Sequence, residues 1–385
     1  MRSKVFLVLS LAGVLSAAAL LFCMSSGRSG KSTLHAGGGD SSAQNPDEQR
    51  VTSLEPLGDV PDIDFARGIQ FIDERRGWVS DQHRIWRTLD GAKSWHLIYK
   101  SPEDRIWGMQ FVSASNGWID VLGKMFGTTD GGQTWAPFKQ PISPYPEGDL
   151  ANFRFVNDGK TGWIVGGIYR TIPSIDRLGP PPRYSRPGSE DQGRVGVIFF
   201  SDDYGKTWER QLLTRSWGYL WNIFALDAKH AWVSGIPGEF YLQQGQWRRM
   251  HHGGMDEYGN FGVRALNLVP GGPNEEPARM FFLNRDEGWI SNFNGHLAKS
   301  SDGGRTWNDL FELDDGSQIM SYFLDIYFRN SNDGWALSHQ GELYRTTDGG
   351  RHWSKLNTGI NAAAMFFLRP DYGLIIAKSG LFRIK

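Results

Sequence analysis

Several familiar signals are missing from this sequence. It contains a single cysteine, Cys23, so no disulfide can form within the chain. Positive and negative charges balance, since 41 Lys and Arg against 42 Asp and Glu leave a net charge of -1, and no strong field favours nucleic acid or an acidic membrane surface. No glycine-rich phosphate loop follows a strand and opens a helix, and no Ser–His–Asp arrangement stands out. Adjacent His251 and His252 lack a third ligand at a recognisable spacing. We expect no cofactor and no metal.

Glycine and tryptophan are abundant instead, with 48 and 16 residues. Glycine-rich turns between aromatic strands are typical of an all-β protein. The 385 residues suffice for one large domain or two ordinary ones.

The N-terminus has the layout of a bacterial export signal. Arg2 and Lys4 precede an apolar run over residues 5–22, and polar, glycine-rich sequence follows. Residues 1–24 are either a signal peptide or a membrane anchor, and Cys23 would be a lipidation site except that Phe22 stands where a small residue is usual. Residues 25–50 read as a flexible linker. We expect the remainder to lie outside the cytoplasm, in the periplasm or at the cell surface.

One short motif is repeated along the chain. An Asp, one or two glycines, a Ser or Thr and a Trp recur in fixed order around five aspartates: Asp90, Asp130, Asp203, Asp302 and Asp348. The carboxylate can accept hydrogen bonds from downstream N–H groups, and the glycines supply positive φ. The motif resembles the Asp-box, or BNR repeat, in which the aspartate has a structural role in a turn between two strands.

The motif belongs to a longer repeat with a Gly-Trp corner upstream. Twelve of the sixteen tryptophans occupy these two marker positions: Trp78, Trp95, Trp118, Trp135, Trp163, Trp208, Trp232, Trp247, Trp289, Trp307, Trp335 and Trp353. They should be framework. The spacing is 40 residues from Trp78 to Trp118, which with four short strands predicts a β-propeller blade. Residues 51–385 would form a single seven-bladed propeller.

Two irregular repeats refine this prediction. The last repeat has three strands only, so the strand around residues 51–57 should complete its blade and close the ring. The fourth repeat lacks the Asp at Leu242–Trp247 and should form a tighter hairpin there. Insertions at 173–194 and 250–279 are candidate binding loops or tolerated decoration.

Arginines provide the candidate binding site. Arg67 and Arg105 precede the innermost strands of the first two repeats, Arg154 lies within that of the third, and Arg264 lies in the second insertion. With Trp107, and with Trp217 and Tyr219 close in sequence, these arginines could grip a peptide or carboxylate at the axial mouth. The alternative is a solvated rim with scattered ion pairs.

Enzymes with Asp-box propellers offer a weaker match. Sialidases carry an Arg-Ile-Pro motif before the first Asp-box, and Arg170-Thr171-Ile172-Pro173 has an extra Thr and follows two boxes. Xyloglucanase-type hydrolases need two propellers and a pair of facing carboxylates, and this chain has room for one propeller. We predict no catalytic residues.

The chain over residues 51–385 resembles the photosystem II stability/assembly factor family, on its Gly-Trp corners, its Asp-boxes and its exported N-terminus. That resemblance implies a seven-bladed, non-enzymatic scaffold that holds a membrane-protein subunit during assembly in photosynthesis. It carries the family's arginine patch to Arg67, Arg105 and Arg154.

Three functions remain open at this point. The first is a monomeric extracytoplasmic scaffold with a protein partner and no nucleic acid, attached to the membrane only through its N-terminal segment. The second is an Asp-box carbohydrate-active protein, either a sialidase-like or other glycoside hydrolase or a lectin. The third is a purely structural envelope protein.

Overall fold

The computed structural model describes residues 53–63, 66–101, 104–139, 141, 148–169, 194–217, 219–236, 240–249, 277–292, 296–312 and 322–385. The predictions for residues 1–24 and 25–50, Cys23, His251, His252 and Arg264 lie outside these residues, as do most of both insertions. Within the described residues, no helix has the length and apolar character needed to cross a membrane.

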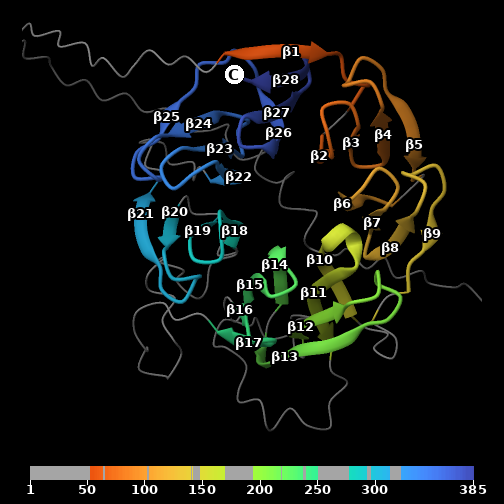
Figure 1. Ribbon diagram of the computed structural model, residues 1–385, viewed down its shortest axis with the longest axis vertical. Coiled ribbons are helices and arrows are strands. Elements are labelled where there is room, and N and C mark those ends of the chain that lie inside the picture. The colour runs from red at the N-terminus through yellow and green to blue at the C-terminus, as the bar shows by residue number, and fades with distance from the viewer. Residues whose placement is uncertain are drawn as a thin grey trace, which may run out of the picture. The chain divides into compact units, whose positions relative to one another are not determined.

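The described chain folds into seven four-stranded antiparallel sheets, arranged as blades around a common axis (Figure 1). In the first six blades the strands follow one another from the axis outward. The inner strands of consecutive blades contact each other, and those of the last and first blades do so as well. The predicted all-β, seven-bladed propeller is therefore confirmed.

The first four blades have the following strands. Blade 1 has β2 (Gly68–Phe71), β3 (Gly77–Ser80), β4 (Arg84–Thr88) and β5 (His96–Lys100). Blade 2 has β6 (Ile106–Phe111), β7 (Gly117–Val121), β8 (Lys124–Thr128) and β9 (Ala136–Pro137). Blade 3 has β10 (Gly148–Val156), β11 (Thr161–Tyr169), β12 (Arg194–Ser201) and β13 (Glu209–Trp217), with the 3-10 helix η3 (Asn157–Gly159) between the first two. Blade 4 has β14 (Tyr219–Asp227), β15 (His230–Ile236), β16 (Phe240–Gln243) and β17 (Gln246–Arg249).

The last three blades complete the ring. Blade 5 has β18 (Pro277–Phe282), β19 (Gly288–Asn292), β20 (His296–Ser300) and β21 (Asn308–Glu312). Blade 6 has β22 (Phe323–Phe328), β23 (Gly334–Ser338), β24 (Leu343–Thr346) and β25 (Ser354–Lys355). Blade 7 has β26 (Ala362–Arg369), β27 (Tyr372–Ala377), β28 (Gly380–Ile384) and, as its outermost strand, β1 (Leu54–Gly58).

The ring is closed by β1, as the sequence predicted. This strand pairs antiparallel with β28, with Leu54 opposite Ile384 and Pro56 opposite Phe382. The two ends of the propeller domain thus share one sheet, and no blade has to bury its faces alone.

The Asp-box turns have the predicted internal hydrogen bonds. In blade 2, Thr128 Oγ1 donates to Asp130 Oδ1 at 2.8 Å, and Asp130 accepts from Thr134 N at 2.9 Å and from Thr134 Oγ1 at 2.6 Å. Gly131 and Gly132 have φ of 77° and 94°, a region that favours glycine. The hydrogen bond from the Thr134 hydroxyl, followed by those from the Thr134 N–H and Thr128, lowers the pKa of Asp130. A carboxylate held in this way is a poor general acid.

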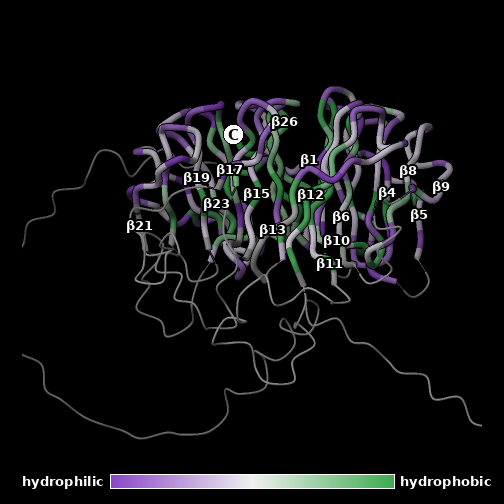
Figure 2. The backbone as a smooth tube through the Cα atoms, turned by 90° about the horizontal axis from the view of Figure 1, so that it is seen from below, coloured by the Kyte–Doolittle hydropathy of each residue, from purple (hydrophilic) through white to green (hydrophobic). Residues whose placement is uncertain are grey.

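The tryptophans of the Gly-Trp corners join neighbouring blades. Four of them stack on a phenylalanine of the next inner strand with centroids 3.7–3.8 Å apart: Trp78 on Phe111, Trp118 on Phe155, Trp232 on Phe282 and Trp289 on Phe328. The glycine of the corner is required because a Cβ at Gly117 would lie 2.4 Å from the Phe111 ring. Hydrophobic stretches run along the strands of the ring (Figure 2). The predicted framework role of these tryptophans is confirmed.

Blade 4 has the expected tighter hairpin in place of an Asp-box. The two-residue turn Gln244-Gly245 joins β16 to β17, with φ of 52° and 75°. This shorter turn has a consequence for the preceding blade. Trp78, Trp232 and Trp289 donate their indole N–H to an Asp-box glycine carbonyl of the next blade, but buried Trp163 Nε1 has no hydrogen-bond partner within the described residues.

The two faces of the ring differ. The Asp-box turns share a face with the turns that end the inner strands, and Gly131 N donates to Ser115 O across this face at 2.7 Å. We refer to it as the Asp-box face. The opposite face, where the inner strands begin, is termed the start face; it carries the turn between the second and third strands of each blade.

Candidate partner-binding surface

Two arginines lie together on the start face. Arg67 directly precedes β2, and its backbone N–H donates to Ser80 O at 2.7 Å. Arg105 directly precedes β6, and its carbonyl accepts from Leu122 N at 2.9 Å. Both side chains are exposed. Desolvation by the surrounding chain, and then the positive charge of Arg105, lower the pKa of Arg67, so the two guanidinium groups are close enough to repel each other.

Trp107 adds an aromatic surface beside Arg105. The register of β6 on β7 shifts between Ile106 and Gly108, which leaves Trp107 at a bulge. A bulge re-aims the side chain of its extra residue, and the Trp107 side chain is 37% exposed. Arg67, Arg105 and Trp107 all lie at or just before the beginning of an inner strand, on the start face; we call these three residues the arginine–tryptophan patch.

Arg154 lies elsewhere on the ring. It pairs with Trp163 in β10 and β11, as Gln110 pairs with Trp118 in blade 2, so it is near the Asp-box end of its strand. Its guanidinium lies 5.9 Å from the centre of the Phe224 ring. Burial lowers the pKa of Arg154, and its Nε has no hydrogen-bond partner within the described residues. Arg154 is therefore an inter-blade residue on the described chain.

Of the aromatic residues expected near the axial mouth, Tyr219 contacts Trp221, with ring centroids 5.6 Å apart. The backbone of Trp217 pairs with Val195 at the end of β13, the outermost strand of blade 3, and only one residue separates Trp217 from the start of β14.

A second charged pair lines the inner strands of blades 5 and 6. Arg279 Nε donates to Leu324 O at 2.5 Å, and the charge of Arg279 acts on the neighbouring Asp325. Burial raises the pKa of Asp325 to about 6, against the opposing effects of Arg279 and of the Ile326 N–H. The sequence analysis missed both residues, because the sequence of one inner strand does not show which side chain of the next inner strand it will contact.

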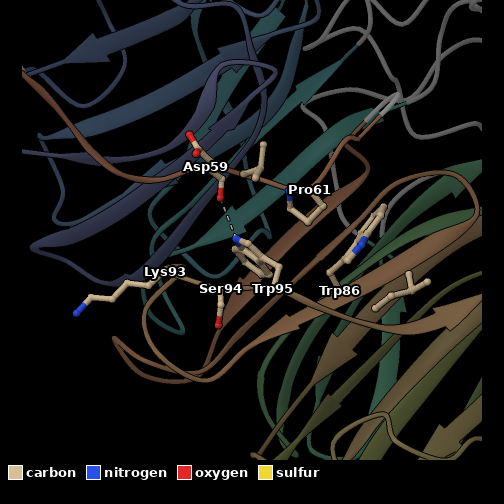
Figure 3. A pocket seen from close by; sticks show the side chains of 8 residues that line it. Asp59, Pro61, Trp86, Lys93, Ser94 and Trp95 are labelled. Carbon is tan, nitrogen blue, oxygen red and sulfur yellow. Dashed lines mark hydrogen bonds between the residues drawn. The ribbon is translucent and has the colours of Figure 1, made fainter.

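A hollow of about 380 Å³ lies on the outer side of blade 1, between residues 59–61 and the first Asp-box. Trp86 and Trp95 form its walls with Pro61, and Trp95 Nε1 donates to Asp59 O at 3.0 Å (Figure 3). This contact anchors the segment that leads from the closing strand β1 to β2. No group of three or more metal-binding side chains occurs in the part of the chain that the structure describes.

The ring and its repeated turns define an Asp-box β-propeller with a basic and aromatic patch on one face. Residues 273–361 match the family model described as photosynthesis system II assembly factor YCF48. The resemblance to the photosystem II assembly factor family, which the Asp-boxes and Gly-Trp corners predicted, is therefore confirmed.

Solved structures are similar over most of the chain. YCF48 bound to D1 peptide is 20% identical, with a TM-score of 0.57 over 86% of this chain and 96% of that one. YCF48 from Cyanidioschyzon merolae is 15% identical, with a TM-score of 0.56 over 86% and 98%. The GH74 xyloglucanase from Xanthomonas campestris is 12% identical, with a TM-score of 0.53; 86% of this chain matches 53% of the enzyme. At these identities the likeness concerns the fold. No curated protein sequence matches the chain.

Proposed function

We propose that this chain is a non-enzymatic extracytoplasmic scaffold that binds a protein partner at the arginine–tryptophan patch. The observation that carries the proposal is the pair Arg67 and Arg105, two like charges that act on each other, with exposed Trp107 two residues beyond Arg105. Two guanidinium groups suit a carboxylate, and an aromatic ring supplies contact area beside it. The resemblance to YCF48, one structure of which holds a D1 peptide, supports a peptide segment of a membrane-protein subunit as the partner.

The sequence supports a proposal for the location and attachment of the chain. The basic start and apolar run of residues 1–24 favour export, and the similar extracellular domain of BT4673 from B. thetaiotaomicron is compatible with a place outside the cytoplasm. We propose that the propeller acts as a monomer, held to the membrane only through the N-terminal segment.

Crosslinking in native membranes tests the scaffold function. The wild-type chain should crosslink to one membrane-protein subunit, identified by mass spectrometry, and Arg67→Ala with Arg105→Ala should reduce that product at least tenfold. Arg75→Ala with Arg285→Ala removes two exposed arginines from the Asp-box face and serves as the matched control. Equal crosslinking by both double variants would rule out the patch as the docking site.

A carbohydrate-active function is the second candidate, because Asp325 has the raised pKa expected of a general acid. The neighbour acting on it in the described chain is Arg279 rather than a second carboxylate, so the pair of acids that glycoside hydrolysis requires is not assembled there. Hydrolysis of sialyl or xyloglucan reporter substrates that is lost in Asp325→Asn would favour this function over the scaffold.

A further inference from the structure

Leu122 occupies an unusual position at the tip of a hairpin on the start face. The two-residue turn Leu122-Gly123 joins β7 to β8, with φ of 51° and 77°. Both residues are left-handed, a conformation that favours Asn, Asp or Gly and disfavours a branched apolar side chain. The Leu122 side chain is also 48% exposed, so packing in the core does not account for it.

The hairpin of blade 4 provides an internal comparison. Gln244 and Gly245 have φ of 52° and 75°, almost the same as Leu122 and Gly123. At that turn the chain places a polar residue in the strained position. The turn geometry therefore does not require leucine, and a leucine that strains the turn while about half of its side chain stays exposed points to a purpose other than packing.

The neighbours of Leu122 suggest that purpose. Its N–H donates to the carbonyl of Arg105 at 2.9 Å, so Leu122 and Arg105 are neighbours across the pair of strands β6 and β7. Trp107, two residues beyond Arg105, is exposed as well. Leu122 thus places a second exposed apolar side chain on the start face, next to Arg105 in the backbone pairing.

We infer that Leu122 and Trp107 receive an apolar side chain of an extended acidic peptide segment whose carboxylate lies against Arg67 and Arg105. This inference rests on the proposed function and specifies the partner. The two arginines precede the inner strands of blades 1 and 2, so the patch crosses a blade boundary and suits an extended segment more than a single residue. Its positive charge selects an acidic side chain, and its exposed apolar surface selects a neighbouring apolar one.

Fluorescein-labelled heptapeptides with blocked ends test this inference. One peptide carries two glutamates and a leucine, and in the second a serine replaces the leucine. Leu122→Asn should weaken binding of the leucine peptide about tenfold, the worth of one buried leucine contact, and should leave the serine peptide unaffected. The variant should melt at the wild-type temperature or higher, since Asn accepts the left-handed turn; a structural role for Leu122 predicts the opposite. Gln244→Leu, the matched control, should change neither peptide.

The remaining outcomes separate the two proposals. Unchanged leucine-peptide binding by Leu122→Asn, with binding lost in Arg67→Ala plus Arg105→Ala, would refute the apolar contact and leave the scaffold function standing. Binding that requires a free terminal carboxylate, or no binding of either peptide by the wild-type chain, would also refute the inference. Whichever of these results is obtained, the crosslinking experiment in native membranes tests the scaffold function independently.

Discussion

The side-chain amide of Gln110 closes the open edge of the next blade by making two hydrogen bonds to Phe155. Its Nε2 donates to Phe155 O and its Oε1 accepts from Phe155 N, both at 2.8 Å. Gln70 makes the same pair of bonds to Phe111. The free edge of an inner strand would otherwise expose unpaired backbone groups near the axis, so the glutamine acts as a substitute for one residue of a neighbouring strand.

Gln110→Met should destabilise the propeller by about 2 kcal/mol, because it leaves a donor and an acceptor of Phe155 without partners while keeping a side chain of similar length. Urea denaturation at neutral pH measures the effect. Gln133→Met removes an exposed amide that bonds only within its own turn, and should change stability by less than about 0.5 kcal/mol. Equal effects of the two substitutions would show that the bridge contributes nothing.

Trp289 and Trp335 occupy equivalent corners with different partners. Trp289 donates to Gly349 O at 2.9 Å and stacks on Phe328. Trp335 Nε1 has no partner within the described residues, since blade 7 has no Asp-box to provide one, and its ring is tilted on Phe367. Trp289→Phe should therefore cost about 1–2 kcal/mol more than Trp335→Phe. Thermal melts of both variants measure the two losses of stability. A larger loss in Trp335→Phe than in Trp289→Phe would contradict this prediction.

The ring could be predicted from the sequence because its determinants are local. An Asp-box turn is specified by residues such as Thr128, Asp130 and Thr134, which lie within a few positions of each other. The spacing between successive copies of the motif gives the length of one blade. The closing strand followed from counting strands in the last repeat. Sequence-local rules of this kind give the number of blades and the framework tryptophans.

The candidate site depends on contacts between neighbouring blades, and these contacts cannot be predicted from the sequence of any single repeat. Arg67 and Arg105 both precede inner strands on the start face, and the charge of Arg105 acts on Arg67. Arg154 was grouped with them on its position in a strand, but its guanidinium lies over the Phe224 ring. Leu122 could not be identified from the sequence, because its strain lies in a backbone angle that only the structure shows. Arg279 and Asp325 become neighbours through register, since each inner strand shifts at a bulge.

Acid should weaken the fold through the Asp-box turns. Hydrogen bonds from the Ser94 hydroxyl, the Ser94 N–H and Thr88 lower the pKa of Asp90 to about 2. A lowered pKa contributes stability that is present above the unfolded-state value near 4 and is lost as pH falls toward 2. Asp90→Asn should flatten the fall in unfolding free energy between about pH 4 and pH 2, measured by urea titration. An unchanged slope would show that Asp90 does not contribute to the acid sensitivity of the fold.

Asp325 should act in the opposite direction. Because burial raises its pKa to about 6, the folded chain binds this proton more tightly than the unfolded chain does, and stability is lost as pH rises from about 4 to 6. Asp325→Asn should therefore be more stable than the wild type by about 2 kcal/mol at pH 8, and by little at pH 4. Urea denaturation at the two pH values measures this difference, with the exposed Asp62→Asn as control for overall charge. A variant that is less stable at pH 8 would show that Arg279 holds the charged form of Asp325, and would make this pair a structural ion pair of the inner ring.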